Sequence, residues 1–364
     1  MIDIMLRWMT KFLDKLGSPE LDWIQVEVTS RCNAACIYCP QPSFYKKQHM
    51  PFSLFKQLLP YIGYTNLVYL QGWGEPLLNP DLFAMIGACK AKGKRVGFTT
   101  NGMLLSEETI RRLVDLETDI ISVSLAGTSP ATHNRIRRGT DLVKIIENLD
   151  RLQQIRAEKG SLHPTVHLAY IMLASNIDEL RNVVELAKRS GAEQIVCSNL
   201  SLIIDKALLT EALFIREEKG QNLTGTLDAI AGKARKENIL FACNQTAPQE
   251  QSVYCSENIS SSCVVSVTGE VGPCVFTSPT LSQADAGEIR KPLIHIYQNS
   301  PAPCYPLSFG NIGKESLTRI WNKKEYEQFR SFYDPDIIKT DNIAMPVPQS
   351  CASCYMKNSR QIAS

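Results

Sequence analysis

The feature that most constrains the fold is a repeat that runs from about residue 22 to residue 200. Short apolar runs rich in β-branched residues alternate with stretches whose apolar residues recur at helical spacing. This alternation predicts successive βα units and a parallel sheet. The six runs are Trp23 to Val28, Asn66 to Gln71, Arg95 to Thr100, Asp119 to Leu125, Thr165 to Leu173 and Gln194 to Ser198.

The count of units favours an open barrel over a closed one. Two further units would be needed to close an eight-unit barrel, and the next hundred residues do not supply them. We therefore expect an α/β fold, a partial (β/α)6 TIM-like barrel whose ligands bind at the carboxyl ends of the strands. The intervening helices are expected to begin near Ser53, Pro80, Ser106, Asp141 and Asn176.

The pattern changes after residue 200, which predicts a second and smaller domain. A helical stretch around Leu223 to Glu237 is followed by the apolar hairpin "CVVSVTGEVGPC", a Pro-rich passage and a helix near Glu315 to Phe332. We expect an N-terminal amphipathic helix at residues 1–20, the barrel at 21–240 and a Cys-rich domain at 241–364. The helix at 1–20 would lie on the fold or on a membrane surface, and we favour the fold.

Composition limits the partners and the compartment. A net charge of +2 in 364 residues, without a long Lys/Arg block, argues against a nucleic-acid partner. The N-terminus lacks the apolar core and the cleavage site of a signal peptide, and we expect no transmembrane segment. Twelve cysteines without a secretory signal predict metal or redox chemistry in the cytoplasm.

Three of these cysteines, Cys32, Cys36 and Cys39, follow the first predicted strand at CxxxCxxC spacing. Thiolates select zinc, copper(I) or iron–sulfur clusters. A structural zinc site is closed by four protein ligands, usually in paired CxxC motifs. Three closely spaced cysteines instead leave one iron of a four-iron cluster open, so we expect a bound molecule to take that position.

The segment resembles the cluster loop of the radical S-adenosylmethionine (SAM) enzymes, and aromatic Tyr38 precedes its third cysteine. The resemblance implies a [4Fe–4S] cluster whose unique iron chelates the amino and carboxylate groups of SAM. It also implies reductive cleavage of SAM to methionine and a 5′-deoxyadenosyl radical, which takes a hydrogen atom from the substrate.

Other segments carry the same resemblance. "LQGWGEPLLNPD" is similar to the family's Gly-Gly-Glu-Pro segment, with Trp73 in place of the first Gly, and implies that Gly74 and Glu75 contact the methionine amino group of SAM. "TTNG", with Asn101, ends the third strand as in the family.

"SVSLAGTSPATHNRIRRG" resembles the stretch that supplies a polar residue on the ribose side and a basic residue, here Ser124 and Arg137, with Arg138 as the alternative. A forked guanidinium suits a carboxylate, whereas a solvated basic turn is the other interpretation. The family often has an acid where this chain has Ala126.

The remaining cysteines form a second group. Cys255 and Cys274 stand as C-x13-G-x4-C around Gly269, and a CxxC pair follows at Cys351 and Cys354. This resembles the SPASM/Twitch extension of radical SAM enzymes, which holds auxiliary four-iron clusters. Because the further cysteines of a complete SPASM pattern do not follow, we expect one auxiliary [4Fe–4S] cluster. Its ligands are expected among Cys255, Cys263, Cys274, Cys351 and Cys354, and a structural zinc ribbon is the alternative.

Cys197, near the end of the sixth predicted strand, has two interpretations. It shares a face with Ile195 and Asn199, and if that face lines the lumen, Cys197 could exchange a hydrogen atom with the substrate. A buried core thiol is the favoured interpretation, and Cys304, Cys89 and Cys243 are also expected to be buried thiols.

The resemblance implies a radical SAM oxidoreductase or maturase that modifies a peptide, protein or cofactor precursor. The segments look closest to maturases of peptides or of metalloenzymes such as tungsten oxidoreductases. An electron donor such as ferredoxin or flavodoxin is the expected redox partner. The alternative is a metal-stabilised iron–sulfur binding or electron-transfer protein without SAM chemistry.

Overall fold

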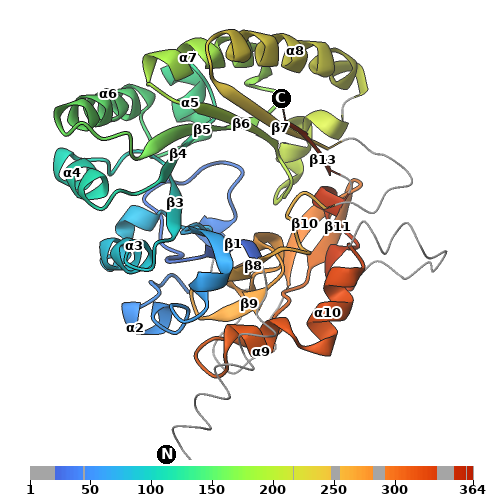
Figure 1. Ribbon diagram of the computed structural model, residues 1–364. Coiled ribbons are helices and arrows are strands. Elements are labelled where there is room, and N and C mark those ends of the chain that lie inside the picture. The colour runs from blue at the N-terminus through green and yellow to red at the C-terminus, as the bar shows by residue number, and fades with distance from the viewer. Residues whose placement is uncertain are drawn as a thin grey trace, which may run out of the picture.

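A curved sheet of eleven strands forms the frame of the protein (Figure 1). The strand order is β12-β9-β8-β1-β2-β3-β4-β5-β6-β7-β13. The predicted helix at residues 1–20 lies outside the described residues. This computed structural model describes residues 21–43, 46–215, 217–246, 255–281, 292–333, 348–357 and 359–363.

The strands from β1 to β7 all pair in parallel, which confirms the predicted parallel barrel sheet. Each of the six predicted runs overlaps one of the first six strands, with ends that differ by no more than two residues. The seventh strand begins at residue 240, where we place the boundary between the domains. Of the residues that favour strands, its sequence "LFACNQT" contains only Phe241 and Thr246, a weak signal. The strands are β1 Leu21–Val26, β2 Thr65–Tyr69, β3 Arg95–Thr100, β4 Ile120–Leu125, β5 Thr165–Met172, β6 Gln194–Asn199 and β7 Leu240–Thr246.

Helices cover the outer face of this parallel sheet (Figure 1). Two of them begin at the predicted caps: the side chain of Ser106 accepts a hydrogen bond from the Thr109 amide, and that of Asp141 accepts one from the Val143 amide. The helices are α2 Phe52–Phe55, α3 Leu82–Lys90, α4 Glu107–Asp115, α5 Pro130–Ile136, α6 Leu142–Glu158, α7 Val183–Arg189 and α8 Glu217–Lys236. No helix in the described ranges has the length and apolar character of a membrane span.

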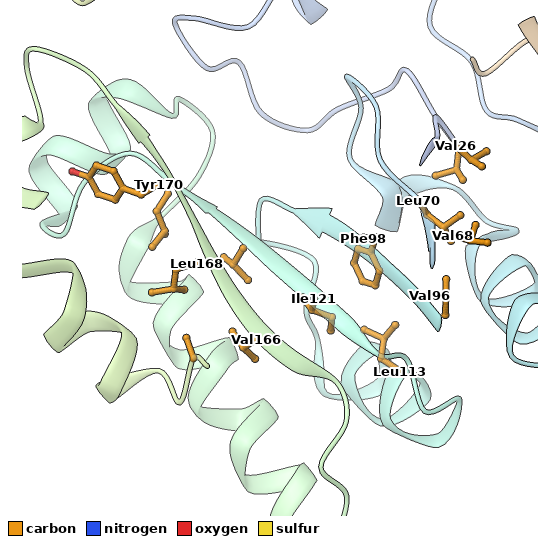
Figure 2. Close-up of a cluster of buried hydrophobic side chains, with 14 of the residues drawn as sticks. Val26, Val68, Leu70, Val96, Phe98, Leu113, Ile121, Val166, Leu168 and Tyr170 are labelled. Carbon is orange, nitrogen blue, oxygen red and sulfur yellow. The ribbon is translucent and has the colours of Figure 1, made fainter. Parts of the chain in front are cut away.

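Alternation along the strands separates the outer core from the lumen. In β5, Val166, Leu168 and Tyr170 are fully buried, whereas the residues between them are half-buried. The buried set packs with side chains of the neighbouring strands and helices, among them Phe98 and Leu113 (Figure 2). The opposite, less buried face therefore lines the lumen.

The C-terminal part of the chain extends the barrel sheet at both edges. β8 Ser262–Val265 pairs in parallel with β1, and β13 Ser359–Ala363 pairs antiparallel with β7. The predicted hairpin corresponds to β8 and β9, and the predicted helix near residues 315–332 is two helices separated at Asn322, the C-cap of the first. The other elements are β9 Glu270–Gly272, β12 Gly310–Asn311, the separate hairpin β10 Leu293–Tyr297 and β11 Ser300–Cys304, and helices α9 Leu317–Trp321 and α10 Lys324–Ser331.

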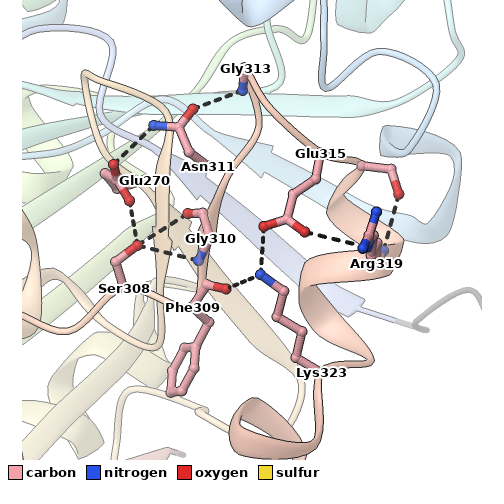
Figure 3. Close-up of polar contacts among 10 residues, drawn as sticks. Glu270, Ser308, Phe309, Gly310, Asn311, Gly313, Glu315, Arg319 and Lys323 are labelled. Atoms are coloured by element: carbon pink, nitrogen blue, oxygen red, sulfur yellow. Dashed lines mark hydrogen bonds and ion pairs between the residues drawn. The ribbon is translucent and has the colours of Figure 1, made fainter.

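A polar network fixes the turn from β12 into α9 (Figure 3). Lys323 Nζ donates to the Phe309 carbonyl at 2.7 Å and to Glu315 Oε1 at 2.5 Å. Asn311 Nδ2 donates to Glu270 Oε1 at 3.1 Å. The Lys323 bonds hold the "FGNIGKES" segment against the start of α10, and the Asn311 bond holds it against the β8–β9 hairpin.

We expect Phe98→Ala to lower the free energy of unfolding by about 3 to 5 kcal/mol, because the ring is fully buried and its loss leaves a cavity. Urea unfolding of the full chain measures this change. Leu162→Ala is the matched control, since Leu162 is 78% exposed and its truncation should change stability by less than about 0.5 kcal/mol. Equal effects of the two substitutions would contradict the assignment of the core.

Candidate active site and auxiliary metal centre

The loop that carries Cys32, Cys36 and Cys39 leaves the end of β1 and lies against the segment that follows α5. The Ala35 amide donates to the Arg138 carbonyl at 2.8 Å, and the Ile37 amide donates to the Ile136 carbonyl at 3.0 Å. Gly139 has a φ of +85°, and a Cβ there would lie 3.1 Å from the Asn33 carbonyl oxygen. Glycine thus permits the close approach of the two segments.

Two of the three cysteines, Cys32 and Cys39, lie in an environment that disfavours free thiolates. Burial raises the pKa of Cys39 to about 12, and the nearby Cys36 and Cys32 shift it in the same direction. Burial also raises the pKa of Cys32. Bound metal supplies the positive charge that deprotonates such thiols. The donor set therefore fits an iron–sulfur cluster.

Arg137 is the charged group of this site. Its side chain is only 7% exposed, donates a hydrogen bond to the Tyr38 hydroxyl, and has a buried Nε that finds no hydrogen-bond partner among the described residues. The neighbouring Arg138 has an exposed side chain. A carboxylate bound beside the cysteines would satisfy the Nε of Arg137. The geometry thus favours Arg137 over Arg138.

Glu75 ties the loop after β2 to the end of β3. Its buried carboxylate accepts from the Asn101 amide at 2.7 Å and from the Thr100 hydroxyl at 2.8 Å. Burial raises the pKa of Glu75, and these hydrogen bonds oppose that shift. Asn101 Nδ2 in turn donates to Asn33 Oδ1 in the cysteine loop at 2.7 Å. The ends of β1, β2 and β3 are therefore linked.

Gly74 lies where no side chain fits. A Cβ there would be 2.3 Å from the Thr29 carbonyl oxygen and 2.6 Å from that of Arg31. The Glu75 amide donates to the same Arg31 carbonyl at 2.8 Å. The structure thus brings the predicted cofactor-binding residues Gly74 and Glu75 against the loop with the three cysteines.

The structure places Ser124 and Cys197 on opposite faces of the sheet. Ser124 is half-buried on β4, on the face that lines the lumen. Cys197 is fully buried in the outer core together with Ile195. The half-buried residues of β6 are Gln194, Val196 and Ser198, which lie on the opposite face. Asn199 is on this outer side too, so the condition for a catalytic Cys197 is not met, and Cys197 is not brought to the site.

Most of the C-terminal cysteines gather around a cavity that is partly open to solvent. Four of the five predicted ligands line it: Cys255, Cys274, Cys351 and Cys354. Cys263 does not line it; it is fully buried on β8 near Arg330 and Tyr326. Burial raises the pKa of Cys354 to about 12 and raises the pKa of Cys255 and Cys274, so these three thiols also need bound metal to ionise.

Sequence reasoning missed other residues of this cavity. Cys304 and His295, both from the β10–β11 hairpin, and Glu257 contribute to its lining. The Cys304 thiol donates to the Phe276 carbonyl at 2.8 Å. The Pro-rich sequence around Cys304 has no ligand spacing that could have indicated this position.

The segments that contain the two sites each match a known protein family. Residues 26–187 match the family described as the radical SAM superfamily, and residues 255–355 match the SPASM iron–sulfur cluster-binding domain. The chain thus carries a radical SAM domain followed by a SPASM domain. Its radical SAM domain implies a four-iron cluster and SAM, and its SPASM domain implies auxiliary iron–sulfur binding.

Curated relatives differ in how much of the chain they match. A Pyrococcus furiosus protein named tungsten-containing aldehyde ferredoxin oxidoreductase cofactor-modifying protein is 24% identical over 343 residues, 93% of this chain and 88% of that protein. A GTP 3′,8-cyclase of Clostridium botulinum is 27% identical over 184 residues, 49% of this chain and 56% of that enzyme. The chain therefore matches little more than half of the cyclase.

Solved structures share the fold at low sequence identity. SuiB of Streptococcus suis bound to S-adenosylmethionine has a TM-score of 0.63 at 13% identity, over 94% of this chain and 72% of SuiB. anSMEcpe with bound AdoMet and Cp18Cys peptide has a TM-score of 0.61 at 14% identity, over 87% of this chain and 84% of that protein. Both confirm the radical SAM fold of this chain.

We expect Arg137→Lys to weaken SAM binding about tenfold or more, because an ammonium keeps the charge but loses the planar fork that pairs with a carboxylate. Isothermal titration of the anaerobic, oxidised protein with SAM measures the affinity. The control is Arg138→Lys, whose exposed side chain should leave affinity within about twofold of the native protein. The reverse order would assign the SAM carboxylate to Arg138.

Proposed function

We propose that this protein is a radical SAM maturase that modifies a peptide, protein or cofactor precursor. The observation that carries the proposal is the convergence of the loop of Cys32, Cys36 and Cys39 with Glu75, Asn101 and the buried Arg137. A protein that only carried a cluster would have no need of the buried guanidinium beside it. When bound, the reduced cluster and SAM supply the 5′-deoxyadenosyl radical that begins the modification.

The residues of the chain would bind the cluster and SAM and orient SAM for cleavage. We assign Cys32, Cys36 and Cys39 to the cluster and Arg137 to the carboxylate of SAM, with Tyr38 holding the guanidinium in place. The carboxylate of Glu75 is engaged by protein donors, so its role is to hold the loop after β2 in shape. That shape presents the backbone around Gly74 to the amino group of SAM, and Ser124 faces the lumen where the ribose would lie.

The polar side chains of the lumen wall favour a substrate that is recognised by hydrogen bonds. The Tyr69 hydroxyl lies 3.1 Å from Thr99 Oγ1, which donates to Gln71 Oε1 at 2.6 Å. Burial raises the pKa of Tyr69, so its hydroxyl remains neutral. These neutral groups, on β2, on β3 and two residues after β2, offer donors and acceptors to a substrate in the lumen.

The relatives support the maturase class. The P. furiosus cofactor-modifying protein matches nearly the full length of this chain, whereas the cyclase matches about half of it. We therefore favour a cofactor precursor or a peptide segment of a metalloenzyme as the substrate. A low-potential ferredoxin or flavodoxin is the proposed electron donor.

The triple substitution Cys32→Ala, Cys36→Ala and Cys39→Ala tests the function. Reduction of the native protein with dithionite in the presence of SAM should release 5′-deoxyadenosine, measured by liquid chromatography, and the triple variant should release none. Release by the triple variant would overturn the assignment of the cluster. A native protein that binds iron but never cleaves SAM would instead support the alternative, an electron-transfer protein.

The auxiliary site gives a second test. We expect the triple variant to retain about four irons per chain, held by Cys255, Cys274, Cys351 and Cys354. In that background Cys354→Ser should lower the iron content or change the electron paramagnetic resonance spectrum of the reduced cluster. Cys263→Ser is the matched control and should change neither, since Cys263 does not line the cavity. Zinc in place of iron would contradict an auxiliary cluster.

A further inference from the structure

Position 73 is the one place in the segment Gly72–Gly74 that accepts a side chain. A Cβ on Gly72 would lie 2.2 Å from Glu27 Cγ, and a Cβ on Gly74 would lie 2.3 Å from the Thr29 carbonyl oxygen. Both glycines are therefore required by close packing against the residues that follow β1. The residue between them, where the family pattern has glycine, is Trp73.

The indole of Trp73 reaches the wall of the auxiliary cavity. Trp73 Nε1 donates to the Val275 carbonyl at 3.3 Å, one residue after the predicted ligand Cys274. The ring meets Phe276 edge-on, with 6.0 Å between centroids, and packs against the apolar cluster that contains Cys304. Phe276 and Cys304 both line the cavity. One side chain thus joins the loop of the SAM site to the auxiliary site.

A buried carboxylate makes a second connection at the same place. Glu27, only 1% exposed, accepts from the Trp73 amide through Oε1 at 3.2 Å. Its Oε2 accepts from the Val267 amide at 3.2 Å and from the Thr280 hydroxyl, both in the C-terminal part of the chain. A buried carboxylate is costly unless such donors remain in place. A shift of the loop would therefore disturb both parts of the protein.

We propose that Trp73, supported by Glu27, is a positioning residue that couples SAM binding in the barrel to the filling of the auxiliary cluster site. An occupied auxiliary site holds the segment after Cys274 in place, and that segment anchors the indole next to Gly74 and Glu75. The coupling is reciprocal, since two linked binding sites change each other's affinity by the same factor. The proposal rests on the SAM site proposed above.

A double-mutant cycle on the full, anaerobically reconstituted chain tests the coupling. The double substitution Cys351→Ser and Cys354→Ser removes the auxiliary cluster, and Trp73→Gly removes the connection. The affinity for SAM is measured by isothermal titration of the oxidised protein. Loss of the auxiliary cluster should weaken SAM binding about fivefold or more in the Trp73 background. It should change the affinity less than about twofold in the Trp73→Gly background, where the connection is already absent.

Two further variants separate coupling from general damage. Trp73→Phe keeps the aromatic packing and loses the Nε1 donor, so it should retain part of the coupling, and it replaces Trp73→Gly if that variant does not fold. Trp321→Phe alters a buried tryptophan of the C-terminal part that packs on Arg330, and it should leave the cycle unchanged.

The outcomes distinguish the two proposals. Equal weakening of SAM binding in both backgrounds, or no weakening in either, overturns the coupling and leaves the SAM site intact. A native protein that binds no SAM overturns the proposed function, and the coupling with it.

Discussion

The pairing of β1 on both sides positions everything else in this protein. β1 pairs in parallel with β2, which begins the barrel, and with β8, which belongs to the C-terminal part of the chain. The cysteine loop leaves the carboxyl end of the same strand. Because backbone hydrogen bonds fix register, the loop, the segment after β2 and the β8–β9 hairpin are all held relative to one strand.

The local part of the fold could be predicted from the sequence, and the non-local part could not. Runs such as Thr165 to Leu173 identify strands because residues that favour strands are concentrated there and their apolar side chains alternate along the run. In β7 the apolar run is only four residues long and is followed by Asn, Gln and Thr, so the strand also depends on its pairing with β6. Similarly, nothing near Ser262 indicates that this residue pairs with Trp23, more than two hundred residues away.

The same division applies to the candidate site. Cysteine spacing identifies a cluster loop because its ligands are close in sequence. Spacing does not distinguish Arg137 from Arg138, since neighbouring residues point in different directions and only the fold shows which one is buried. Strand alternation likewise predicts only part of the answer for Cys197. It shows that Cys197 shares a face with Ile195 and Asn199, but whether that face packs on helices or lines the lumen depends on the curvature of the sheet.

Two buried carboxylates show how the loop after β2 is held. Glu75 connects it to β3 through Thr100 and Asn101, and Glu27 connects it to β1 and to the C-terminal part. Burial raises the pKa of both carboxyl groups, so the ionised form of each is stable only while its hydrogen-bond donors are in place. An apolar contact could slide, but a carboxylate that accepts from separate elements permits only one arrangement. That requirement suits a site that must hold a reactive radical in a fixed position and away from water.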